Sequence, residues 1–146
     1  MSWGILSPVD DLVARDIGLP GVVRSVRAAR AFVEEAMANC PDGVRRIAVL
    51  LVSELATNAV LHAQSPFDVR VRMDGERVRV EVHDGSPTLP VVKDYGVDAV
   101  TGRGVRLVQL LSSRWDVEAG PDGKTVWFEI GLTSGAPDEE RAWSTT

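Results

Sequence analysis

The sequence is poor in cysteine, in histidine and in long apolar runs, and each shortage excludes a class of protein. Its single cysteine, Cys40, can form neither an internal disulfide nor a cysteine-rich zinc site, which fits a reducing compartment. Its two histidines lack the spacing of zinc ligands. No stretch approaches the roughly 20 apolar residues that cross a bilayer, and the first residues do not resemble a signal peptide. We therefore expect a cytoplasmic protein without a membrane segment.

Positive charge is also scarce. The 146 residues carry a formal net charge of -5, whereas nucleic-acid-binding domains are usually basic. The four tryptophans are too scattered along the chain to form a platform for stacking bases. A nucleic-acid-binding α/β domain is therefore the weakest of the interpretations considered. The length suits one domain, which can bury a core without metals or disulfides.

The apolar pattern predicts helices first and hairpins later. Steps of three and four residues predict a helix from Val22 to Met37, and a second from about 43 to 62 with Asp42 as its N-cap. The expected core face of the second helix is Ile47, Leu50, Leu51, Leu55 and Leu61. The segment 17–20 is expected to form a short strand or turn before them.

Strict alternation of apolar and polar residues predicts two antiparallel hairpins, 67–73 with 78–83 and 115–119 with 126–130. A third helix is expected over 105–112. The predicted fold is a two-layer α/β sandwich, in which three helices cover one face of a mixed, mainly antiparallel sheet. Residues 1–17 are interpreted as an N-terminal extension and 133–146 as a flexible tail.

The second helix carries a polar stripe, because Glu54, Asn58 and His62 stand four residues apart. A carboxylate and a carboxamide one turn apart can serve a hard cation such as magnesium, and the carboxylate can accept a proton from a nucleophile. The spacing alone favours a solvated stripe on an amphipathic helix. The dense apolar residues beside the stripe argue that this helix is largely covered.

Three further segments carry weaker signals. Asp84 and Gly85 follow a strand, where the carboxylate could accept a hydrogen bond from a base amino group, although Asp-Gly is also common in turns. The stretch Thr101–Val108 places Gly102 and Gly104 at a helix start, which attracts phosphate, with Arg103 between them. This is neither a Walker A loop nor a dinucleotide-binding fingerprint. Thr125, at the start of the last strand, could face a pocket beside Asp84 or simply favour the strand.

Taken in order along the chain, these motifs resemble the ATPase domain shared by gyrase, histidine kinases and related proteins (the GHKL superfamily, or Bergerat fold). Within it, the likeness is strongest to the short single-domain branch of anti-sigma-factor serine/threonine kinases. The resemblance covers residues 18–132, which would form the ATP-binding domain. It implies ATP and Mg²⁺ as ligands.

The resemblance implies a role for each matching residue. Glu54 is similar to the general base, and Asn58 to the residue that holds magnesium. Asp84 resembles the carboxylate that receives the adenine amino group, and Thr125 the threonine near the adenine. The residues that resemble the phosphate-binding segment are Gly102, Arg103, Gly104 and Val105, and the segment 90–101 would be the lid over the nucleotide.

The sequence departs from the family pattern after Asp84, where Ser86 and Thr88 stand in place of two expected glycines. The helix pair that carries the phosphoacceptor histidine of histidine kinases is not found, so we expect no histidine-kinase activity. The implied function is an anti-sigma-factor kinase that phosphorylates a serine of a small antagonist protein or sequesters a sigma factor, and that forms a homodimer. The alternative is a non-catalytic ATP-binding interaction module.

Overall fold

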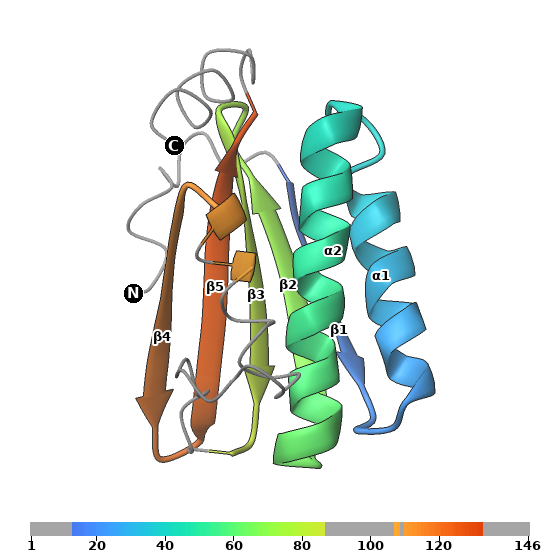
Figure 1. Ribbon diagram of the computed structural model, residues 1–146, viewed down its shortest axis with the longest axis vertical. Coiled ribbons are helices and arrows are strands. Elements are labelled where there is room, and N and C mark those ends of the chain that lie inside the picture. Colours follow the sequence, from blue (N-terminus) through green and yellow to red (C-terminus); the bar gives the residue numbers. More distant parts are fainter. Residues whose placement is uncertain (1–12, 87–106, 109, 133–146) are drawn as a thin grey trace.

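The computed structural model describes residues 13–86, 107–108 and 110–132. Figure 1 shows two helices packed on one side of a twisted sheet, which confirms the predicted two-layer α/β architecture. In chain order the elements are β1 (Val13–Leu19), α1 (Arg24–Ala36), α2 (Asp42–Asn58), the π-helical turn η1 (Ala59–Ala63), β2 (Phe67–Met73), β3 (Arg77–Asp84), β4 (Arg114–Gly120) and β5 (Gly123–Gly131).

The sheet has the strand order β1-β2-β3-β5-β4, and each neighbouring pair is antiparallel. The two predicted hairpins, β2–β3 and β4–β5, are confirmed. The expectation of a mixed sheet is wrong for the described strands. The reason lies in the first connection: α1 and α2 form a helical hairpin that returns the chain to the end of the sheet where β1 finished, so that Leu19 pairs with Phe67.

The edge strand β1 is longer than the sequence suggested, since it begins at Val13 and pairs with β2 along its whole length. Residues 13–17, interpreted from the sequence as part of an extension, therefore belong to the sheet. The strand gives little periodic signal because only Ile17 and Leu19 among its described side chains pack against the core.

The core lies between the helices and the facing side of the sheet. Alternate residues of β2 and β3 supply its floor, and the small side chains of Ala29, Ala48 and Ala56 let the helices approach closely. The predicted core face of α2 is wrong at two positions, because Leu50 and Leu61 are 41% and 47% exposed. The buried face of α2 is instead rotated toward Val44, Ala48, Leu51, Val52, Leu55 and Ala56.

Two α-helices, rather than the three expected, are complete in the described chain. The predicted start of the third helix, including Val105, lies outside the described residues. Positions 107, 108, 110 and 111 are helical, and Val108 is fully buried in the core. The N-cap of α2 is Pro41 and not Asp42, which sits in the first helical turn and pairs with Arg45 at 2.6 Å. None of the described helices is both long and apolar enough to span a membrane.

Candidate functional site

Asn58 is the last residue of α2 and the most unusual polar side chain on it. Both its amide oxygen and its amide nitrogen are buried, and neither has a hydrogen-bond partner among the described residues. A buried amide without partners costs free energy, of the order of 1–3 kcal/mol for each lost hydrogen bond. Native proteins rarely keep such a group unless a ligand, an ion or a water completes it. The position therefore suits a ligand-binding role.

Glu54 lies one helical turn before Asn58, so the predicted stripe exists as a structural feature. Its side chain is half-buried, whereas Leu50, one turn earlier again, is exposed. Glu54 therefore stands where the covered and open parts of this side of α2 meet. His62, the third predicted member of the stripe, is exposed in η1. The π-helical turn shifts it out of the four-residue repeat, because such a turn holds one extra residue.

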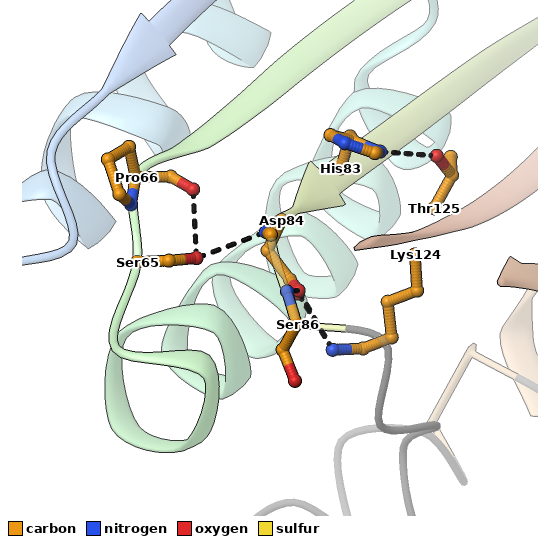
Figure 2. A network of polar contacts seen from close by, with 8 residues as sticks. Ser65, Pro66, His83, Asp84, Ser86, Lys124 and Thr125 are labelled. Atoms are coloured by element: carbon orange, nitrogen blue, oxygen red, sulfur yellow. Dashed lines mark hydrogen bonds and ion pairs between the residues drawn. The ribbon is translucent and has the colours of Figure 1, made fainter. Parts of the chain in front are cut away.

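Asp84 ends β3 and points to the same side of the sheet as the helices. It is buried, and the ammonium group of Lys124 donates hydrogen bonds to its carboxylate, with Nζ 3.0 Å from Oδ1 and 2.9 Å from Oδ2. The backbone N–H of Ser86 donates a third hydrogen bond to Oδ1 at 2.8 Å. Figure 2 shows the lysine side chain reaching toward the carboxylate at the end of the sheet.

Thr125 does not lie beside Asp84, so its predicted orientation is wrong. The pairing of β3 with β5 sets Lys124 opposite Asp84 and Thr125 opposite His83. Neighbouring residues of a strand point to opposite faces, so Thr125 faces away from the helices. Its hydroxyl group is 2.9 Å from Nδ1 of His83 (Figure 2). Both side chains lie on the side of the sheet opposite the helices, which we call the open face. The residue that shares Asp84's face is Lys124, which the sequence reasoning missed.

Gly123 explains how β5 comes so close to Asp84. Its φ of +120° is one that side chains rarely permit, and a Cβ there would lie 2.0 Å from the carbonyl oxygen of Asp84. The glycine thus allows the turn after β4 to pack directly on the backbone of β3. The next residue, Lys124, is thereby placed within reach of the carboxylate.

Asp84 is also connected to the end of the helical layer. The N–H of Gly85 donates a hydrogen bond to Oγ of Ser65 at 3.1 Å, and Ser65 follows η1 closely in sequence. Gly21 packs against the backbone of Ser65, where a Cβ would lie 2.5 Å from its carbonyl oxygen. The end of β3, the end of the α2–η1 helix and the loop before α1 therefore meet at one corner.

The expected phosphate-binding residues Gly102, Arg103, Gly104 and Val105, and the expected lid over 90–101, lie outside the described residues. Of the predicted site, the structure describes Glu54, Asn58, Asp84 and Thr125. The first three lie on the helix side of the sheet, and Thr125 lies on the other side.

The open face of the sheet carries a separate charged network. Arg79 of β3 is 1% exposed and contacts two carboxylates, with Nη1 3.3 Å from Glu129 and Nε 3.3 Å from Glu81. Its guanidinium carbon also lies 3.9 Å from the centre of the Trp127 ring, a cation–π contact. Burial raises the pKa of both Glu81 and Glu129, and the charge of Arg79 only partly offsets that effect. Beside this network, a cavity of about 440 Å³ is bordered by residues that include Asp68, His83 and Thr125.

Comparison with known proteins identifies the class. The sequence matches the family model described as "Histidine kinase-like ATPase domain" over residues 19–130, which is most of the chain. The chain therefore belongs to the histidine kinase-like ATPase domain family. No curated protein sequence matches it significantly.

Two solved structures resemble it. One contains the RsbU and RsbW domains of Rv1364c from Mycobacterium tuberculosis, with a TM-score of 0.65 and 22% identity over 83% of this chain. The present chain spans about a third (33%) of that longer one, and the likeness establishes the shared fold. The other is the histidine kinase domain of the blue-light activated histidine kinase EL346 from Erythrobacter litoralis, with 33% identity, a TM-score of 0.47, and coverage of 61% of this chain and 45% of the other.

Proposed function

We propose that the chain binds ATP with Mg²⁺ and acts as a serine/threonine kinase of the anti-sigma-factor type. It would phosphorylate a serine of a small antagonist protein, bind a sigma factor, and work as a homodimer in the cytoplasm. The observation that carries the proposal is the buried, unpartnered amide of Asn58, one turn beyond Glu54, within a histidine kinase-like ATPase domain.

Asn58 fits a role as a magnesium ligand. Mg²⁺ takes oxygen ligands, and it binds through one or two protein groups together with the phosphates of a nucleotide. The Oδ1 atom of Asn58 has no partner among the described residues, so it is available as such a ligand. Bound magnesium would offset negative charge on the phosphates. The expected segment Gly102–Val105 would complete the phosphate site.

Glu54 is proposed as the general base. It would accept the proton of the substrate serine as the serine oxygen bonds to the γ-phosphorus and the bond from that phosphorus to ADP breaks. A half-buried carboxylate at the border of the covered surface can be reached by a protein substrate. Asp84 would accept the amino group of adenine at the other end of the site.

ATP binding without phosphoryl transfer is the second candidate. It is favoured by Glu54 itself, because no hydrogen bond or ion pair holds its carboxylate among the described residues. General bases are normally oriented by a further group. The two candidates agree on ATP and disagree only on transfer.

The decisive comparison is Glu54→Gln against Glu35→Gln, a matched change at an exposed glutamate of α1. Both variants should keep the rise in melting temperature that ATP with Mg²⁺ produces. Only Glu54→Gln should lose transfer of radiolabelled phosphate to the antagonist, by about 100-fold or more. If wild-type protein binds ATP but transfers no phosphate, the non-catalytic candidate holds. If saturating ATP leaves the melting temperature unchanged, both candidates fail.

A further inference from the structure

The Asp84–Lys124 pair is a buried salt bridge in which 6% and 9% of the two side chains are exposed. Its carboxylate already accepts three hydrogen bonds: two from Lys124 and one from the N–H of Ser86. A carboxylate has about four acceptor positions, so one remains once its contacts with the described residues are counted. An ammonium group has three N–H donors, and contacts with the described residues use two of those of Lys124. The pair as a whole can therefore accept one more hydrogen bond and donate one more.

This arrangement changes what the base site can recognise. A carboxylate alone only accepts hydrogen bonds, so it would select a base edge that donates, such as the 6-amino group of adenine. An added ammonium group only donates, and it complements an acceptor such as a 6-keto oxygen. Adenine offers its amino donor beside the acceptor N1. Hypoxanthine offers the reverse, a keto acceptor beside the donor N1–H.

We propose that Lys124 is a base-recognition residue, and that the Asp84–Lys124 pair lets this site bind 6-keto purine nucleotides as well as 6-amino ones. The inference rests on the proposed function, in which Asp84 receives the base. It predicts a relaxed purine specificity, with inosine triphosphate (ITP) bound nearly as well as ATP.

The backbone places Lys124 within reach of Asp84. Register places it directly opposite Asp84, and Gly123 brings its strand against the Asp84 carbonyl oxygen. Buried ion pairs contribute little net stability compared with well-packed apolar groups, so stability alone does not explain why a charged pair stands here. A charged pair at the end of the sheet, next to the exposed Gly85, is better explained by recognition.

The first test needs no variant. Titration calorimetry with wild-type protein and Mg²⁺ should give dissociation constants for ATP and ITP that agree within about fivefold. A carboxylate acting alone would disfavour ITP by roughly 10- to 100-fold, the factor that one lost hydrogen bond to a charged group represents. Discrimination of about tenfold or more in favour of ATP would overturn the proposal.

The second test compares Lys124→Met with Lys124→Arg. Methionine removes the donor, so the preference for ATP over ITP should rise by about tenfold or more, mainly through weaker ITP binding. Arginine keeps a donor, and its preference should stay within a few-fold of wild type. An unchanged preference in a folded Lys124→Met protein contradicts the proposal. If that variant does not fold, the wild-type ratio decides. Failure of wild-type protein to bind either nucleotide refutes the proposed function together with this inference, whereas tight binding of ATP alone refutes only the inference.

Discussion

The Arg79 network on the open face and the Asn58 position on α2 bury polar groups in different ways. On the open face, Arg79 lies between Glu81 and Glu129 and against the ring of Trp127, so opposite charges are paired there. Some polar atoms of these residues, such as Oε2 of Glu81 and Nε1 of Trp127, nevertheless have no hydrogen-bond partner among the described residues. Around α2 on the helix face the surroundings are apolar, and the amide of Asn58 is buried without a partner among the described residues. The first arrangement balances its charges within the sheet itself. The second is an uncharged amide whose donor and acceptor both lack a partner among the described residues, which suits a ligand site.

Removing Arg79 should have the largest effect on stability. Arg79→Met leaves two buried carboxylates without their central cation, and we expect a loss of about 3–5 kcal/mol in the free energy of unfolding. Urea denaturation measures it. Arg77→Met is the matched control, because Arg77 is more exposed and lies 3.8 Å from Glu129, and its loss should stay below about 1 kcal/mol. If both variants lose the same free energy of unfolding, the two carboxylates do not depend on Arg79 as their buried partner.

Gly123→Ala should be the next largest change, and it acts on the helix-face end of the sheet. The new Cβ would clash with the Asp84 carbonyl oxygen as well as strain the backbone, so we expect a loss above about 2 kcal/mol. Gly75→Ala tests strain alone, since its φ is +96° and nothing lies within 4 Å of the added carbon. That control should lose only about 1 kcal/mol in the same denaturation experiment. A smaller loss for Gly123→Ala than for the control would mean that β5 does not pack on Asp84 as described.

Asn58→Ala should be nearly neutral in stability, in contrast to Arg79→Met. Its amide has no hydrogen bond to lose among the described residues, so the free energy of unfolding should change by about 1 kcal/mol or less. The same variant should lose most of the Mg²⁺-dependent part of the melting-temperature rise with ATP. A large loss of stability without nucleotide would place Asn58 among the structural polar groups and erase the difference between the two faces.

The smallest expected effect concerns pH. Burial raises the pKa of Glu129 in the folded protein above its ordinary value near 4.5, so the folded state binds a proton more readily than the unfolded state. This carboxyl group therefore contributes stability that is present below its ordinary pKa and is lost as pH rises through its folded pKa. The free energy of unfolding of wild type, relative to that of Glu129→Gln, should therefore rise on acidification. If the relative stability of wild type falls on acidification instead, the charge of Arg79 lowers the pKa of Glu129 by more than burial raises it.

Local signals in the sequence predicted the elements that local contacts determine. Each hairpin joins neighbouring strands through a short turn, and the alternation within β2 and β3 showed which side is buried. The four-residue spacing of Glu54 and Asn58 likewise survives folding, because both lie in one continuous helix.

What the sequence could not supply depends on contacts between distant segments. The register of β3 against β5 joins residues about forty positions apart, and a shift of one residue exchanges Thr125 for Lys124 as the neighbour of Asp84. Similarly, the side of α2 that is buried depends on where α1 and the sheet lie. The apolar pattern alone did not reveal this, and it wrongly placed Leu50 and Leu61 in the core. A lysine just before a predicted strand threonine was the available signal, and it is a weak one.

The π-helical turn after Asn58 sets how the residues on either side of it are oriented relative to each other. Successive residues of an α-helix are rotated by about 100°, so the number of residues between two anchored points fixes their relative orientation. Here the two anchored points are Asn58, whose amide is turned inward, and Ser65, whose hydroxyl group binds Gly85 beside Asp84. The wider turn over Ala59–Ala63 accommodates one extra residue between them and so decouples the two orientations. Deleting one residue of this turn would rotate Ser65 relative to Asn58. The chain could then keep either the buried amide of Asn58 or the hydrogen bond from Gly85 to Ser65, but not both.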